Sequence, residues 1–439
     1  MDIFKRLRTS RVLANISWVV IGRVAQMLIS FIVGILTARY LGPSNYGLIS
    51  YAGVYTGFFT SVASLGLNSV IVKELIDNKE RQGTILGTVM ALKTVASGCC
   101  IAAIVMLTLI IDRGEQTTNL VVFLCSLALL LQATNVFEFW FQSRLESKLS
   151  ALAALIAYAV TAAYRVVLLV TRQSVEAFAI ATSIDYACIT VVQIWFYRRR
   201  SGPRLSFSRQ DAARMLKSSC HFMLSNMMVA IYGNTDKFMI KHMLGSEAEV
   251  GYYSIALTLN LTWTFVLTAI IDSFNPIIME SRQQNIEEYR RRNQQLYGII
   301  FYISTVVSLG ITILAKPIIG IMYGEAYAGA VSPLRIITWY TAFSYLGVAR
   351  NAWIVCEGKQ KYLKYLYGSA VVLNILFNYI LIPPYGPSGA AVASLATQIG
   401  TSIVLPLMIK PLRENSLLII DGVLLKWKRK NSGGSNLAE

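Results

Sequence analysis

The residues LANISWVVIGRVAQMLISFIVGILTA (13–38) decide the class of fold. They are almost continuously apolar, and Arg23 is their one charged residue. A bilayer core about 30 Å thick needs about 20 such residues for one helical crossing. The basic segment MDIFKRLRTSR leads into this stretch, and LTARYLGP ends it without the small-residue pattern of a signal-peptide cleavage site. The stretch therefore predicts a retained first membrane span.

The composition extends this reading to the whole chain. Of 439 residues, 55% are hydrophobic and 14% charged, whereas soluble domains carry about 25% charged residues. A net charge of +17 would suggest a nucleic-acid partner in a soluble protein. Here it indicates basic loops beside anionic lipid headgroups, and no nucleic-acid partner is expected.

The sequence does not contain the motifs expected for a disulfide framework, a metal site or a nucleotide-binding loop. Six cysteines without a CxxC pair and only two histidines indicate neither a disulfide framework nor a metal site. The chain contains no GxxxxGK[ST] loop, so no nucleotide-driven motor is expected. We predict no catalytic residues and no cofactor, and energy for transport would have to come from a gradient.

The same length criterion predicts an all-α membrane protein with about twelve transmembrane helices. The expected spans, separated by short loops, are 13–38, 47–72, 84–111, 119–140, 150–171, 175–196, 218–243, 251–278, 296–315, 331–354, 363–383 and 388–409.

The Lys and Arg residues predict the orientation. Of 40, 29 lie on the side that carries both termini, six lie on the opposite side and five fall inside spans. Cytoplasmic segments carry the excess of Lys and Arg. We therefore expect a multi-pass protein of the bacterial cytoplasmic (inner) membrane with both termini in the cytoplasm.

The longest loop divides the chain into two halves. We expect an N-terminal six-helix lobe (1–200), a basic cytoplasmic linker (201–217), a C-terminal six-helix lobe (218–410) and a cytoplasmic tail (411–439). The turn LGPSNYG after the first span is echoed by LGSEAEVGYY after the seventh, which favours a repeat of one lobe. The tail segment ENSLLIIDGVLLKWKRKN predicts an interfacial helix.

Cations inside the spans are the candidate binding residues. A charge at mid-bilayer costs at least about 2.5–3.5 kcal/mol on insertion scales, so such residues face a partner or a polar cavity. The candidates for an anionic substrate are Arg23, Lys93, Arg165 and Arg350. Their surplus in the first half predicts a cationic cavity suited to a diphosphate. A local ion pair or snorkelling to the interface is the structural alternative, chiefly for Arg350 and Arg335.

Carboxylates inside the spans are the candidates for ion coupling. They are Asp185, Asp272 and Asp236, although Asp236 beside Lys237 also fits an interfacial pair. The seventh span is the most polar of the twelve, and Gly233 beside Asn234 suggests a bend that would serve as a gate.

The order and spacing of several motifs resemble a known family. LTARYLGPSNYGLISY, SLGLNSVIVKEL, FEFWFQSRLESK, LGSEAEVGYYSIA and IPPYGPSGAAVAS are similar to segments of Wzx-type polysaccharide (O-antigen) repeat-unit flippases. These belong to the superfamily that includes lipid II flippases and MATE drug exporters. The resemblance runs from the first span to the twelfth.

This resemblance implies two lobes around a central cavity that opens alternately to either side. The implied substrate is an undecaprenyl diphosphate-linked oligosaccharide in lipopolysaccharide biosynthesis. Membrane lipids, a coupling proton or sodium ion, and the polymerase and chain-length regulator of the same pathway are the implied partners. Lipid II flippases place an Arg in the first span, which corresponds here to Arg23. They have two further helices that hold the lipid tail, whereas twelve spans are expected here.

Two other functions fit parts of the sequence. A MATE-like antiporter of organic cations shares the fold, but surplus intramembrane cations disfavour a cationic substrate. A polytopic glycosyltransferase or polymerase would handle the same lipid. Such an enzyme usually carries its catalytic groups on a sizeable loop, and the expected outer loops are short.

Overall fold

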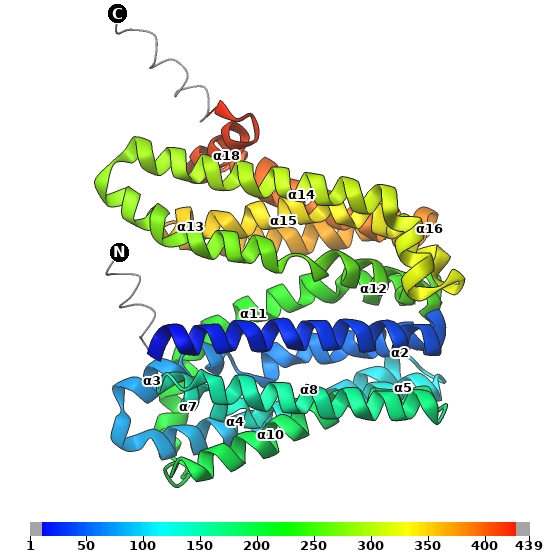
Figure 1. The fold of residues 1–439 in the computed structure, drawn as a ribbon, viewed down its shortest axis with the longest axis vertical. Coiled ribbons are helices and arrows are strands. Elements are labelled where there is room, and N and C mark those ends of the chain that lie inside the picture. Colours follow the sequence, from blue (N-terminus) through cyan, green and yellow to red (C-terminus); the bar gives the residue numbers. More distant parts are fainter. Residues whose placement is uncertain (1–10, 427–439) are drawn as a thin grey trace, which may run out of the picture. The chain divides into compact units, whose positions relative to one another are not determined.

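The computed structural model describes the backbone of residues 11–426 and the side chains of residues 26–426. Every regular element among the described residues is a helix. The chain divides into two compact units, one ending at Asn234 and the other beginning at Thr235. Long helices run side by side within each unit (Figure 1). This bears out the predicted all-helical membrane fold.

The first unit contains the helices of the N-terminal half. Its elements are α2 (Arg11–Ala63), α3 (Ile71–Asp77), α4 (Gln82–Ile111), α5 (Gln116–Ser126), α6 (Ala128–Gln132), α7 (Val136–Ser143), α8 (Ser147–Val170), α9 (Val175–Ala179), α10 (Ala181–Arg199) and the first part of α11 (Arg209–Leu244). Short 3-10 turns connect some of them. A buried core joins α3, α4 and α7 around Trp140 and Phe141.

The second unit begins within α11. Its further elements are α12 (Glu247–Thr262), α13 (Phe265–Gln284), α14 (Ile286–Tyr323), α15 (Val331–Cys356), α16 (Leu363–Ile399), a π-helical turn (Gly400–Val404), α17 (Leu405–Met408) and α18 (Lys410–Val423). A core around Tyr297 and Trp353 joins α13, α14, α15 and α18.

Two of the longest helices each contain two spans separated at a glycine. Gly42 in α2 has φ 71° and ψ 173°, and Gly386 in α16 has φ 57° and ψ −138°. Residues with a Cβ rarely adopt a positive φ, so glycine suits both breaks. A proline follows each glycine, and its fixed φ suits the first position of the next helix.

The number of spans depends on these breaks. Among the described residues, seven helical stretches are long and apolar enough to cross a membrane, and the bent pair α12–α13 makes eight. Two of the seven contain the breaks at Gly42 and Gly386 and so supply two expected spans each. The more polar α11 and α15 cover the expected spans 218–243 and 331–354. Together these segments correspond to the twelve predicted spans.

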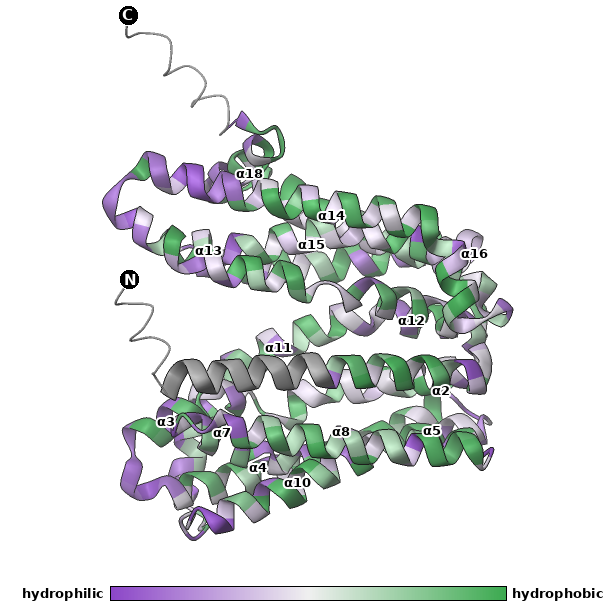
Figure 2. Cartoon of the chain, viewed as in Figure 1, coloured by the Kyte–Doolittle hydropathy of each residue, from purple (hydrophilic) through white to green (hydrophobic). Residues whose placement is uncertain are grey.

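The basic loops gather at one end of each unit. In the first unit, ion pairs join Arg81 to Asp211 at 2.6 Å and Arg214 to Glu74 at 3.0 Å. In the second, the corresponding pairs are Arg282–Glu357 at 2.9 Å and Arg290–Glu414 at 2.8 Å. Figure 2 shows hydrophilic residues around α3 and at the turn between α13 and α14, and apolar residues along the middle of the helices. Loops that the sequence predicts on the cytoplasmic side therefore lie together within each unit, and the orientation itself stays a prediction.

The segment expected as a linker is an ordered strap (residues 200–208) followed by the first turns of α11. The strap lies against α4, where Ser206 N donates to Gly83 O at 3.3 Å and Ser208 N donates to Thr88 Oγ1 at 3.0 Å. A Cβ at Gly87 would come within 2.3 Å of Ser206 O, so only glycine permits this approach. The strap and α4 thus form one packed element.

Candidate functional site

Asp236 accepts four side-chain hydrogen bonds within the second unit. Its side chain is buried near the end of α11. Asn374 and Asn378 of α16 donate to Oδ1 at 2.9 and 2.6 Å, and Ser394 Oγ donates to Oδ2 at 2.6 Å. Tyr253 of α12 also donates to Oδ2. We call these five residues the Asp236 cluster.

The geometry of α16 explains how the Asp236 cluster assembles. Asn374 and Asn378 are four residues apart, so both side chains lie on one helix face. The break at Gly386 reverses the chain and brings Ser394 to the same carboxylate. The Oδ1 atom of Asn378 is buried and has no hydrogen-bond partner among the described residues. The cluster therefore offers an acceptor oxygen in addition to its carboxylate.

Sequence reasoning identified only part of the Asp236 cluster. Asp236 is a predicted residue for ion coupling, whereas Asn374 and Asn378 are not among the predicted site residues. Their spacing was the available signal. Tyr253 and Ser394 carried no such signal, since only the tertiary structure brings them to Asp236.

Lys93 is a buried cation within α4 of the first unit. Its side chain is 3% exposed, and Nζ donates to Asn68 Oδ1 at 2.6 Å. The ammonium also lies 5.4 Å from the centre of the Phe139 ring. It lines a cavity of about 40 Å³ whose polar residues include Ser64 and Gln132. Lys93 forms no ion pair among the described residues, although the Glu138 carboxylate is near enough to act on it electrostatically.

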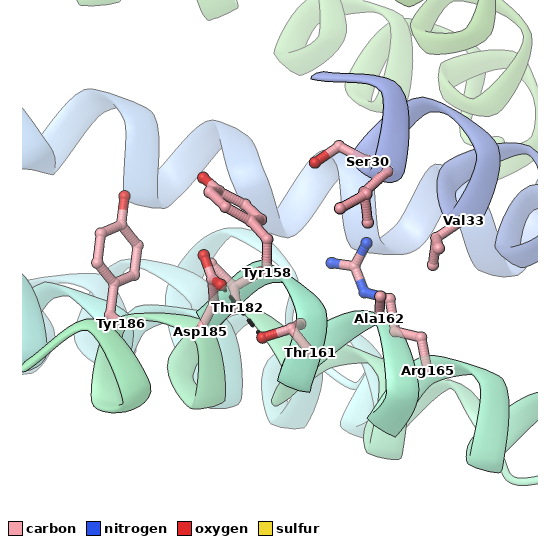
Figure 3. Close-up of a pocket in the computed structure, with 10 residues that line it drawn as sticks. Ser30, Val33, Tyr158, Thr161, Ala162, Arg165, Thr182, Asp185 and Tyr186 are labelled. Atoms are coloured by element: carbon pink, nitrogen blue, oxygen red, sulfur yellow. Dashed lines mark hydrogen bonds between the residues drawn. The ribbon is translucent and has the colours of Figure 1, made fainter. Parts of the chain in front are cut away.

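Arg165 and Asp185 share a second cavity of about 200 Å³ among α2, α8 and α10 (Figure 3). Thr161 Oγ1 donates to Asp185 Oδ1 at 3.1 Å. The guanidinium of Arg165 extends toward the side of the cavity formed by Ser30 and Val33. Arg165 and Asp185 act on each other electrostatically but form no direct ion pair. The structure brings these two predicted residues together, whereas Lys93 lines a different cavity.

Arg350 serves as a backbone partner in the second unit. It is 5% exposed, and Nη1 donates to the carbonyl oxygens of Thr401 at 3.3 Å and Ser402 at 3.4 Å. These carbonyls belong to the π-helical turn, where the regular α-helical hydrogen bonds are interrupted. These contacts give Arg350 a structural role, although its buried Nε has no hydrogen-bond partner among the described residues. Its role in substrate binding stays a prediction.

The remaining candidates are less constrained by contacts. The side chain of Arg23 lies outside the described residues. Asp272 is exposed on α13 and has no hydrogen bond or ion pair among the described residues. At the predicted gate, α11 continues through Gly233 as one helix, and Asn234 Nδ2 donates to Ala230 O at 2.8 Å. The gate stays a prediction.

Residues 35–332 match the family described as "Polysaccharide biosynthesis protein", which covers more than half of the chain. The chain belongs to this family. A relative named "Putative O-antigen transporter" from Escherichia coli (strain K12) is 21% identical over 393 residues, covering 87% of this chain and 92% of that protein. An uncharacterized membrane protein of Methanocaldococcus jannaschii is 23% identical over 230 residues, covering 49% of this chain and 45% of that protein.

Solved structures share the fold of this polysaccharide biosynthesis protein. The lipid II flippase MurJ in an inward closed conformation superposes with a TM-score of 0.70 at 14% identity, covering 96% of this chain and 93% of that chain. An inward-facing MATE family multidrug transporter gives 0.67 at 16% identity, covering 94% and 96%. The predicted family and the MATE-like fold are confirmed, and the chain is a multi-pass membrane protein.

Proposed function

We propose that this protein flips an undecaprenyl diphosphate-linked oligosaccharide from the cytoplasmic to the outer leaflet of the bacterial inner membrane by alternating access. The observation that carries the proposal is that charged side chains are buried within the spans of a fold shared with a lipid flippase. The relative named as an O-antigen transporter aligns over most of both chains and points to the same substrate class.

In this proposal Lys93 binds the diphosphate headgroup, together with Arg23. Its present partner, the amide oxygen of Asn68, is neutral. A hydrogen bond from an ammonium to a phosphate oxygen is stronger than one to an amide, so a diphosphate can replace Asn68. The cavity of about 40 Å³ must widen for this exchange, which places headgroup capture in another conformation of the transport cycle.

The Asp236 cluster is proposed to bind the coupling ion. Asp236, Asn374, Asn378 and Ser394 all carry side-chain oxygen atoms, and hard cations prefer oxygen ligands. Rotation of the two amides would turn their oxygens toward a cation beside the carboxylate. These ligands favour sodium, and a proton on Asp236 is the other form of coupling.

The membrane potential assists export of the anionic headgroup. Moving one charge across 100 mV changes the free energy by about 2.3 kcal/mol. At 100 mV, negative inside, export of a diphosphate with roughly two negative charges is therefore favoured by about 4.6 kcal/mol. The coupled ion would then return the carrier to its inward-facing state.

Reconstitution into liposomes tests the function. The probe is the lipid-linked oligosaccharide of the protein's own bacterium, labelled on its sugar, and the measurement is its exposure to a membrane-impermeant reagent. We expect movement of intact lipid without new glycosidic bonds. Lys93→Gln should slow flipping roughly ten- to a hundredfold, the effect of one hydrogen bond to a charged group.

Arg335→Gln is the matched control for Lys93→Gln. Arg335 is an exposed cation on α15, and its Nε donates to Thr312 O at 3.3 Å. Arg335→Gln removes one positive charge, as Lys93→Gln does, but from an exposed position. The flipping rate should therefore stay close to that of the parent chain. A parent protein that moves no lipid would refute the proposal, and new glycosidic bonds would identify an enzyme instead.

A further inference from the structure

The cavity of Arg165 and Asp185 contains a cation and an anion that do not neutralise each other directly. Both line the same space of about 200 Å³ within the first unit. Asp185 accepts one hydrogen bond, from Thr161, although a carboxylate offers about four acceptor positions. Arg165 has five N–H donors and no hydrogen bond or ion pair among the described residues. Donors and acceptors are therefore both available to a ligand.

The charge balance of this cavity disfavours a diphosphate. Arg165 brings one positive charge, and Asp185 brings one negative charge into the same small space. Like charges placed together in a partly desolvated site repel strongly. Phosphate oxygens drawn to Arg165 would approach the Asp185 carboxylate, so the pair selects an uncharged polar group.

The other lining residues fit a hydroxyl-rich ligand. Ser30, Thr182 and the phenols of Tyr158 and Tyr186 add groups that both donate and accept, and the two rings add flat apolar surface (Figure 3). Sugar hydroxyls also donate and accept, so they can bond to the carboxylate and the guanidinium at once. Pockets for drug-sized ligands span about 300–1,000 Å³. A cavity of about 200 Å³ suits a single ring better than an oligosaccharide.

We propose that this cavity binds one uncharged monosaccharide unit of the lipid-linked oligosaccharide. Asp185 accepts hydrogen bonds from sugar hydroxyls, and Arg165 donates to hydroxyl or ring oxygens. The inference rests on the proposed flipping function, and it gives Arg165 a role separate from the headgroup residue Lys93. The site reads part of the sugar while the diphosphate is bound elsewhere.

The test compares two lipids on protein in nanodiscs. One is the lipid-linked oligosaccharide from the protein's own bacterium, and the other is undecaprenyl diphosphate without sugar. The measured quantity is the Kd for undecaprenyl diphosphate divided by the Kd for the lipid-linked oligosaccharide. This ratio isolates the contribution of the sugar to binding. Arg165→Gln and Asp185→Asn should each reduce this ratio roughly ten- to a hundredfold. Binding of undecaprenyl diphosphate should stay within about twofold of the parent value.

A change at the headgroup site gives a different result. Lys93→Gln should weaken binding of both lipids equally and leave the ratio unchanged. Tyr186→Phe removes one hydroxyl and keeps the ring, so it serves as a milder variant if a charged-site variant does not fold. It should reduce the ratio roughly two- to tenfold, the effect of one neutral hydrogen bond.

The alternatives give distinct outcomes. One contrary result is that Arg165→Gln weakens binding of undecaprenyl diphosphate and Asp185→Asn strengthens it. This result would show that the cavity holds the diphosphate, and it would overturn the sugar site. A parent protein that flips lipid but binds both lipids equally would also overturn it, while the flippase proposal would stand. A parent protein that flips neither lipid would remove the flippase proposal and this inference together.

Discussion

Replacing Asp236 by Asn tests whether the Asp236 cluster binds the coupling ion. The substitution keeps the shape of the side chain but removes its charge. Four donors now converge on two carboxylate oxygens. An amide offers one oxygen, and its NH₂ group points a donor at the partners of the other. If the amide oxygen takes the place of Oδ1, the hydroxyls of Tyr253 and Ser394 can turn to accept from the NH₂ group, and their own O–H donors then need other acceptors. If it takes the place of Oδ2, the NH₂ group faces the amide donors of Asn374 and Asn378, which must rotate.

The expected cost follows from these contacts. A buried donor left without an acceptor costs about 1–3 kcal/mol. Rotation of Asn374 and Asn378 can restore some bonds, and removal of a buried charge offsets part of the rest. We expect a loss of about 1–2 kcal/mol in potassium buffer. Sodium at a hundredfold excess over its Kd would stabilise the parent by about 2.7 kcal/mol, and this gain should vanish in Asp236→Asn.

The assay is thermal unfolding of the purified protein in nanodiscs, with sodium or potassium chloride at equal ionic strength. Asp272→Asn is the control, because Asp272 is an exposed carboxylate without a described partner. It should keep the full sodium response. An Asp236→Asn protein that still gains stability from sodium would refute the ion site. If the parent shows no sodium response, flipping under a pH gradient decides whether Asp236 carries a proton, and equal rates in parent and variant would exclude that role too.

Three further predictions concern packing and topology. Gly87→Ala should lower the melting temperature by displacing the strap, because overpacking costs about 1–3 kcal/mol. Gly98→Ala is the control and should be tolerated, since a Cβ there meets open space. Equal melting temperatures in the two variants would disprove the close approach at Gly87. In a Cys-free background, Leu205→Cys should resist an impermeant thiol reagent added outside cells and Glu115→Cys should react, and the reverse pattern would invert the topology. Arg350→Gln should reduce thermal stability and leave headgroup affinity unchanged; lost affinity at unchanged stability would return this residue to the substrate site.

Interactions along the chain made the architecture predictable. Span length follows from the thickness of the bilayer, and the Gly-Pro pairs at 42–43 and 386–387 mark breaks that local backbone geometry requires. The polar residues of α11 likewise identified Asp236 as unusual. These features depend on neighbours in sequence, so they could be found without tertiary contacts.

The site depended on which helix faces meet. Sequence predicted that Lys93 and Arg165 share a ligand, but they line different cavities, and Arg165 instead lies with Asp185. The sequence also places Arg350 inside a predicted span, yet its guanidinium donates to backbone carbonyls of the π-helical turn. Hydropathy fixes the depth of a charge in the membrane, because depth depends on position along one helix. The partner of that charge depends on helix rotation and packing, which only the tertiary structure decides.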